Sequence, residues 1–306
     1  MRRLVLALGL QALAGLVVWL VVAVVALSID TAALDLVTVL LLFGQLVVVP
    51  LGLLLHPASG DRLGDALARG GRLLLRIGGV AAIASLAIPR GELSAAVAAI
   101  YLVPALLVAA SSVLRVRAIR GPSDLAVVGA GISLFIGSLL FVLHRQDVAF
   151  VGLPELGVQV SAVHFHFAGF GLVSMAGALA RRSPRLGTAA VYLLLGGTWL
   201  TPIGMLVATS IHVVAAAAVV GGLAALIAGT FPLLGDVRIA AAARRLLFVS
   251  IAFALFVEAS AAWFVVGEAT GTTLIDFGTM ARLHGTFAAI GVVFCGLLGW
   301  RLVEAH

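Results

Sequence analysis

The stretch LVTVLLLFGQLVVVPLGLLL, residues 36–55, carries no charged side chain along its whole length. An α-helix rises 1.5 Å per residue, so about 20 residues cross the roughly 30 Å of hydrocarbon in a bilayer. A helix also satisfies its backbone amide and carbonyl groups internally, as a segment surrounded by lipid must. The stretch therefore predicts a membrane-spanning helix.

The composition of the whole chain extends this prediction. Of its 306 residues, 63% are hydrophobic and 10% are charged, against about half and about a quarter in soluble globular proteins. The formal net charge of +6 comes from arginines in the short segments between apolar stretches. This pattern indicates membrane topology and not a nucleic-acid-binding surface. We therefore expect the lipid bilayer to surround the chain, and we expect no nucleic-acid partner.

Further apolar stretches have lengths suited to crossing a bilayer. We predict an all-α polytopic integral membrane protein, with one membrane domain over residues 1–306 and about ten transmembrane helices. The predicted helices cover residues 4–29, 36–55, 73–89, 93–114, 124–143, 158–180, 187–208, 211–233, 246–266 and 283–302. Residues 56–72 form the longest predicted inner loop, which has room for a short interfacial helix.

The basic residues give each predicted helix a direction, because cytoplasmic loops are enriched in arginine and lysine. With the N-terminus in the cytoplasm, all but three of the 19 basic residues fall on the cytoplasmic side. The three exceptions are Arg90, Arg145 and Arg282. The even number of helices then predicts that the C-terminus is cytoplasmic as well.

Several histidines lie on the outer side or in the outer half of residues 144–306, which we take as the site-bearing half. They are His144, His164, His166, His212 and His284. The helical rise puts His164 and His166 roughly 9 and 12 Å below the outer boundary, and Glu258 at a similar depth. Ionisable groups inside a span usually face a protein interior, a water-filled cavity or a cofactor. The sequence thus predicts a site in the outer half of the membrane.

His164 and His166 are two residues apart on one predicted helix. Side chains at this spacing point about 200° apart, so the two imidazoles do not easily share one metal ion. Three interpretations stay open. The histidines could hydrogen-bond a neighbouring helix and face a polar cavity, ligate a metal or haem, or relay protons and contact a substrate.

Glu258 is a carboxylate that the sequence places within a membrane-spanning helix, residues 246–266. Such a group must be protonated, paired or hydrated, and proton-coupled transport uses groups of this kind. Its candidate partners are His166, His212 and Arg282. The alternative is a neutral glutamic acid that only hydrogen-bonds a neighbouring helix.

The segment HFHFAGF, residues 164–170, followed later by Leu283-His284-Gly285-Thr286-Phe287, resembles the YndJ-like family of bacterial and archaeal membrane proteins. The resemblance covers mainly the C-terminal half. It implies a polytopic protein of the prokaryotic cell membrane, of a kind often described as a transporter without an established substrate.

The run Val163-His164-Phe165-His166-Phe167 is also similar to the His-Phe-His segment of haem-copper oxidase catalytic subunits, in which opposed histidines ligate two haems. His284-Gly285 is similar to the helix that supplies the other low-spin haem ligand. The order of the two helices is reversed here, and the adjacent histidine pair of the copper site is missing. This similarity implies a haem- or metal-binding relative that uses His164, His166 and His284, not a complete oxidase.

These observations favour a transporter or permease for a small solute or ion. Its site would hold His164, His166 and Glu258, with His212 and His284 at the entrance. Arg282, close to His284 in the sequence, is also a candidate site residue. The competing hypothesis is a haem- or metal-binding oxidoreductase or sensor. An intramembrane enzyme acting on lipids is a third hypothesis, but the chain has no recognisable nucleophile motif or paired carboxylates for it.

Overall fold

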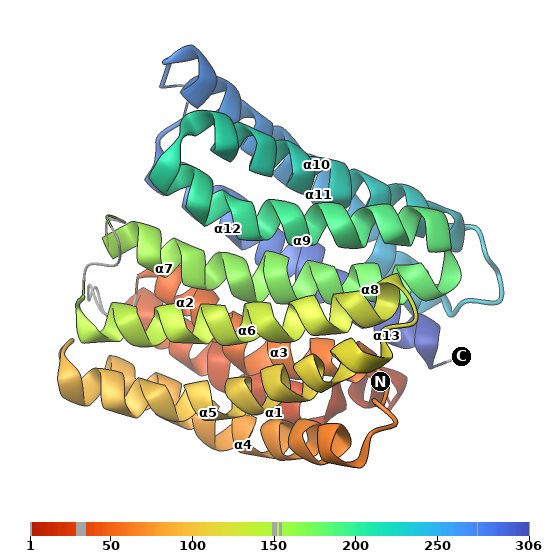
Figure 1. Cartoon of the computed structure of the whole chain (residues 1–306), viewed down its shortest axis with the longest axis horizontal. Coiled ribbons are helices and arrows are strands. Elements are labelled where there is room, and N and C mark those ends of the chain that lie inside the picture. The colour runs from red at the N-terminus through yellow and green to blue at the C-terminus, as the bar shows by residue number, and fades with distance from the viewer. Residues whose placement is uncertain (1, 29–34, 149–151, 153–154, 274, 306) are drawn as a thin grey trace.

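The computed structural model describes residues 2–28, 35–148, 152, 155–273 and 275–305. Within these ranges the regular structure is helical, and long helices run side by side along one direction (Figure 1). The protein is therefore an all-α polytopic membrane protein. Its elements are α1 (Arg2–Ser28), α2 (Leu36–Phe43), η2 (Gly44–Val48), α3 (Val49–Gly52), η3 (Leu53–Leu55), α4 (Arg62–Leu86), α5 (Glu92–Leu114), η4 (Arg115–Ala118), α6 (Pro122–Gln146), α7 (Glu155–His164), η5 (Phe165–Leu172), α8 (Val173–Arg182), α9 (Pro184–Val207), α10 (Thr209–Thr230), η6 (Phe231–Leu234), α11 (Ala241–Thr270), α12 (Phe277–Thr286), η7 (Phe287–Phe294) and α13 (Cys295–Glu304).

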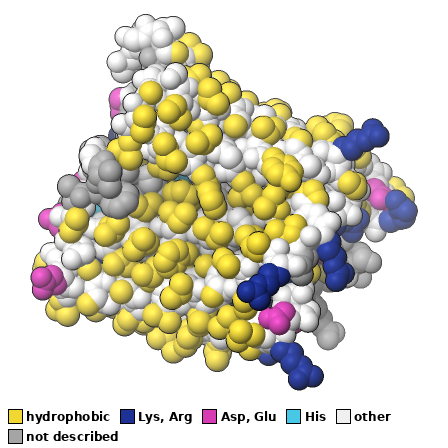
Figure 2. All heavy atoms as spheres, viewed as in Figure 1, with side chains coloured by type: hydrophobic (Ala, Val, Ile, Leu, Met, Phe, Trp, Pro, Cys, Tyr) yellow, Lys and Arg dark blue, Asp and Glu magenta, His cyan; other side chains and the backbone are white. Residues whose placement is uncertain are grey.

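Nine helical segments among the described residues are long and apolar enough to cross a membrane. They coincide with nine of the predicted spans to within a few residues. The remaining prediction, residues 73–89, falls on α4, a 25-residue helix whose first half carries several arginines. Hydrophobic side chains cover much of the face of the bundle that Figure 2 shows, as contact with lipid requires.

Helix α4 differs from the prediction because it begins at Arg62, so most of the predicted loop 56–72 is helical. Asp61 caps this start, since its carboxylate accepts a hydrogen bond from the Gly64 amide at 2.6 Å. The helix then packs along α5, where Gly78 lets the two backbones approach. A methyl group at Gly78 would lie 3.1 Å from the Cα of Tyr101.

The two ends of the bundle differ in charge. Helix α1 begins and α13 ends at the same end (Figure 1), and the arginine side chains gather at that end (Figure 2). We call it the arginine-rich end. Its assignment to the cytoplasm stays a prediction from the distribution of arginines.

The structure explains why Arg145 lies at the opposite end of the bundle. Its side chain is 3% exposed and donates hydrogen bonds to Ser94 Oγ at 2.8 Å, the Ser85 carbonyl at 2.9 Å and the Ile88 carbonyl at 2.7 Å. The last carbonyls of a helix have no partners within it. Arg145 thus satisfies groups at the end of α4 and ties α6 to α4 and α5.

Three π-helical segments, η2, η5 and η7, contact one another in the centre of the bundle. The ring of Phe43, next to η2, lies 6.4 Å from the ring of Phe167 in η5 and 5.5 Å from that of Phe294 in η7. A π-helical turn widens the helix and shifts the side chains that follow it, and such turns are frequent at functional sites. The helices that carry His164 and His284 are both interrupted in this way.

Candidate functional site

A cavity of about 200 Å³ lies among α2, α7, η5, α9, α10, α11, α12 and η7. Its lining includes four of the ionisable residues selected from the sequence: His164, His212, Glu258 and His284. We call this space the His/Glu cavity. The four side chains come from four different helices, so the fold brings together groups that lie far apart in the chain.

His164 is the last residue of α7, directly before the π-helical segment η5. Its Nε2 atom is buried, and no described residue provides it with a hydrogen-bond partner. A buried imidazole nitrogen without a partner loses the hydrogen bond that water would give it. His164 is therefore placed to bind a proton, a water molecule or a polar group of a ligand in the cavity.

His284 reaches the cavity from α12. Ser260 Oγ lies 3.4 Å from His284 Nδ1, and the same hydroxyl donates a hydrogen bond to the Val257 carbonyl at 2.8 Å. Because the hydroxyl proton is already used, Ser260 can only accept from His284. This weak contact favours a proton on Nδ1, which leaves Nε2 as an acceptor.

His212 lies in the first turn of α10, lines the cavity and is buried. Gly204 of α9 makes its position possible, because a methyl group there would lie 2.5 Å from the Cα of His212. The close crossing of α9 and α10 thus depends on a residue without a side chain. It holds the His212 side chain at the cavity wall.

Glu258 lies near the middle of α11 and is half-buried. It forms no hydrogen bond or ion pair with any other residue that the structure describes. Of its three candidate partners, only His212 also lines the cavity. Glu258 is therefore a carboxylate in a largely apolar space without an arginine beside it.

Arg282 does not line the His/Glu cavity. Its side chain is exposed on α12, and its Nη2 atom approaches the position where a methyl group on Gly278 would be, at 3.7 Å. Its charge also favours the ionised form of the Asp276 carboxyl, whose pKa is lowered mainly by hydrogen bonds from Thr279. Arg282 therefore acts on the nearby loop and not on Glu258.

His166 faces away from the cavity. Its ring is 0% exposed, its Nδ1 atom lies 2.8 Å from the Ala162 carbonyl, and its ring centroid lies 6.2 Å from that of Tyr101. Gly137 of α6 leaves room for it, because a methyl group there would lie 2.7 Å from His166 Nδ1. The two histidines thus point in different directions, as their spacing predicts.

The surroundings of His166 do not fit a haem. A haem ligand needs open space beside a ring nitrogen, whereas helix backbones and the Tyr101 ring enclose His166. Among the described residues no group of three or more His, Cys, Asp or Glu side chains is arranged to hold a metal ion. A haem or metal hypothesis would therefore depend on His164 and His284 in the His/Glu cavity.

Sequence reasoning did not find a second cavity, at the arginine-rich end. Its lining includes His56, Asp65, Arg69, Arg72 and Arg115. In the sequence these arginines indicate only membrane topology. The sequence signal was present, since Arg69 and Arg72 lie three residues apart and share one face of a helix.

Comparison with known proteins identifies a family. The model of the YndJ-like protein family matches residues 39–292, a range that contains His164, His212, Glu258 and His284. No curated protein and no solved structure matches the chain. Because the family model covers most of the sequence, this multi-pass membrane protein belongs to the YndJ-like family.

Proposed function

We propose that this protein is a transporter of the prokaryotic cell membrane and that the His/Glu cavity is its substrate site. One observation carries the proposal: four ionisable residues from four helices line one cavity whose other side chains are mostly apolar. Ionisable groups inside membrane proteins are costly and usually mark substrate or proton pathways. A cavity that only resulted from imperfect packing would not need them.

The lining of the cavity supports a substrate class. Most of its wall is apolar, with side chains such as Leu40, Phe167, Leu172, Val257 and Phe264. A dry protein cavity of about 150 Å³ is large enough to hold benzene, so about 200 Å³ suits a small organic molecule. We therefore propose a small amphipathic solute, with its apolar part against these side chains and its polar group near Glu258 and His164.

In the proposed mechanism, the His/Glu cavity binds a proton as well as the solute. A carboxylate without a positive partner in an apolar space binds either a proton or a cationic group. Occupancy of Glu258 and His164 by proton or substrate would then favour one orientation of the transporter over the other. The π-helical segments η5 and η7, which border the cavity, give the helices local freedom at this point.

The test is a flux measurement in proteoliposomes that contain an entrapped pH-sensitive dye. A panel of small amphipathic amines and carboxylic acids is added outside, and proton movement is recorded for each solute. We expect solute-dependent proton flux that Glu258→Gln abolishes and His164→Ala reduces. Glu92→Gln, which removes an exposed carboxylate at the start of α5, should keep the flux. Flux unchanged by both cavity variants would contradict the proposal.

A further inference from the structure

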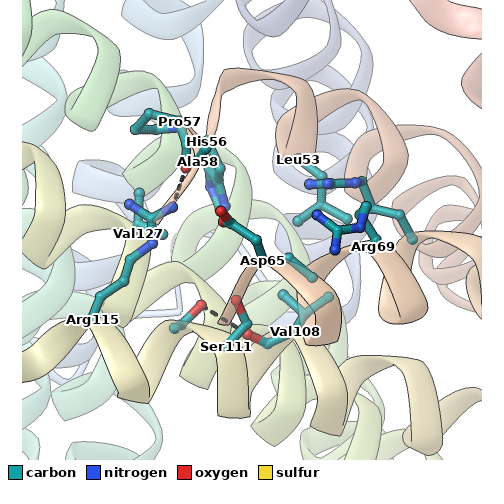
Figure 3. Close-up of a pocket in the computed structure, with 13 residues that line it drawn as sticks. Leu53, His56, Pro57, Ala58, Asp65, Arg69, Val108, Ser111, Arg115 and Val127 are labelled. Atoms are coloured by element: carbon teal, nitrogen blue, oxygen red, sulfur yellow. Dashed lines mark hydrogen bonds between the residues drawn. The ribbon is translucent and has the colours of Figure 1, made fainter. Parts of the chain in front are cut away.

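The second cavity, at the arginine-rich end, has a volume of about 180 Å³. It lies between the segment after η3, the first turns of α4 and the end of α5. We call it the arginine pocket and define it by His56, Asp65, Arg69, Arg72, Ser111 and Arg115. Figure 3 shows His56 and Asp65 between Arg115 on one side and Arg69 on the other.

The arginine pocket has more positive than negative charge. Its lining holds three arginines and one carboxylate, Asp65. That carboxylate is already occupied, because Oδ1 accepts hydrogen bonds from the Ser59 amide at 2.7 Å and the Ser59 hydroxyl at 2.8 Å. An excess of positive charge around a partly enclosed space favours an anion there.

The arginines differ in how they are held. Arg115 donates a hydrogen bond to the Pro57 carbonyl, and its Nη1 atom lies 3.9 Å from Asp124. Arg69 and Arg72 form no hydrogen bond or ion pair with another described residue. Their guanidinium groups therefore keep their donors for a ligand. Planar guanidinium groups bind phosphate and carboxylate oxygens in pairs.

The serine hydroxyls of the pocket and His56 Nε2 already donate to other protein groups, so they are not available to bind an anion. Ser111 donates its hydroxyl hydrogen to the Gly64 carbonyl at 2.7 Å, and Ser112 donates to the Val108 carbonyl at 2.9 Å. His56 Nε2 lies 2.9 Å from Ser174 Oγ, whose own hydrogen goes to the Phe170 carbonyl. His56 is thus the donor to Ser174, and the anion would be held by the arginines.

His56 lies in the positive field of these arginines and is partly shielded from water. Burial, together with the charges of Arg115, Arg181 and Arg72, lowers the pKa of His56 from 6.5 to about 3. The imidazole is therefore neutral at neutral pH and adds no positive charge. The arginines alone provide the field that an anion would offset.

The surface beside the pocket indicates the source of the anion. Leu73, Ile77 and Val80 follow Arg72 along one face of α4, and their side chains are 63%, 61% and 69% exposed. In a membrane this exposed apolar face would contact acyl chains, with the arginines at the level of the headgroups. Basic pockets between helices at the cytoplasmic side are suited to anionic lipid headgroups.

We propose that the arginine pocket binds a phosphate group through Arg69, Arg72 and Arg115. A water molecule takes about 30 Å³ in the liquid, so the pocket has room for a phosphate group. The geometry favours the headgroup of an anionic phospholipid, whose chains would lie along α4. A free phosphate compound presents the same chemistry, and the experiment separates the two sources.

The experiment compares the full chain with two double variants. The test variant is Arg69→Gln with Arg72→Gln. The matched control is Arg244→Gln with Arg245→Gln, at the start of α11, which removes the same charge from the same end of the protein without touching the pocket. Native mass spectrometry measures phosphatidylglycerol retained by each protein. Thermal unfolding in detergent with added inorganic phosphate measures the free anion.

We expect the wild type and the control to retain phosphatidylglycerol, and the test variant to bind it about tenfold or more weakly. Stabilisation of the wild type and the control by inorganic phosphate, without lipid retention, would support the phosphate site and assign it to a free anion. If the wild type binds neither probe, or the test variant binds as well as the control, the proposal is overturned. The single variant Arg69→Gln, at an exposed side chain, repeats the comparison with the smallest effect on folding.

Discussion

His164 and His166 lie on opposite sides of one helix: His164 lines the His/Glu cavity, whereas the ring of His166 packs 6.2 Å from that of Tyr101 in the core. The helix thus separates two environments. His164 is available to a ligand, and His166 contributes to packing among η5, α5 and α6. Removal of His164 and removal of His166 should therefore affect different properties of the protein.

We expect His164→Ala to reduce flux with little effect on thermal stability, and His166→Ala to do the opposite. Removing a completely buried ring leaves a cavity, and such truncations cost about 2–5 kcal/mol. Thermal unfolding in detergent and proteoliposome flux, measured on the same preparations, check the pair. Equal losses of stability in both variants would contradict the separation of the two environments.

We expect Arg145→Gln to destabilise the protein strongly, because the side chain holds carbonyls at the end of α4. Hydrogen bonds to a charged group contribute about 1.5–3 kcal/mol each, so the loss should be about 3 kcal/mol or more. Arg90→Gln is the control. Arg90 is partly exposed and forms ion pairs with Asp147 and Glu155, and pairs of this kind contribute about 1 kcal/mol or less. A drop in unfolding temperature no larger for Arg145→Gln than for Arg90→Gln would contradict this assignment.

The sequence was sufficient for the helices, because an uninterrupted apolar stretch of span length has few other stable structures in lipid. It was insufficient for the start of α4, where Arg62, Arg69 and Arg72 lower the hydropathy although the segment is helical. The cap at Asp61 was a signal for that start. The three π-helical segments have no signature of their own in the sequence, since they depend on packing among η2, η5 and η7.

The helical rise predicts similar depths for His164 and Glu258, and in the structure both residues line one cavity. The direction of each side chain was not, because one sequence does not tell which face of a helix meets which neighbour. For this reason the sequence alone does not separate His166 and Arg282 from the cavity residues. The sequence does not predict the arginine pocket, because membrane topology already explains the same arginines.

The two cavities allow the orientation of the chain to be tested. In a variant with Cys295→Ser, a cysteine is introduced either at Ala261, in the His/Glu cavity, or at Ala68, in the arginine pocket. We expect a membrane-impermeant thiol reagent to label Ala261→Cys in intact cells and Ala68→Cys only in inside-out vesicles. The arginine-rich end would then be cytoplasmic. Labelling of Ala68→Cys from outside intact cells would reverse the predicted topology.

The haem hypothesis is tested by the absorption spectrum and metal content of the purified protein. We expect neither a Soret band nor a metal at one equivalent per chain, because His166 is enclosed and Glu258 and the cavity histidines suit a proton or a solute. A Soret band that disappears in both His164→Ala and His284→Ala, but persists in His166→Ala, would instead assign a haem to the His/Glu cavity and contradict the transport proposal.

His56 should make the stability of the protein depend on pH. In the folded chain, burial and nearby arginines lower the pKa of His56 from 6.5 to about 3. Between these values the unfolded chain binds a proton that the folded chain does not, so acidification favours unfolding. The contribution of His56 to stability is thus fully present above about pH 6.5 and is lost as the pH falls towards 3. His56→Gln, which keeps a donor for Ser174, should flatten this dependence in thermal unfolding scans. An equally steep profile in wild type and variant would show that His56 is not buried beside the arginines.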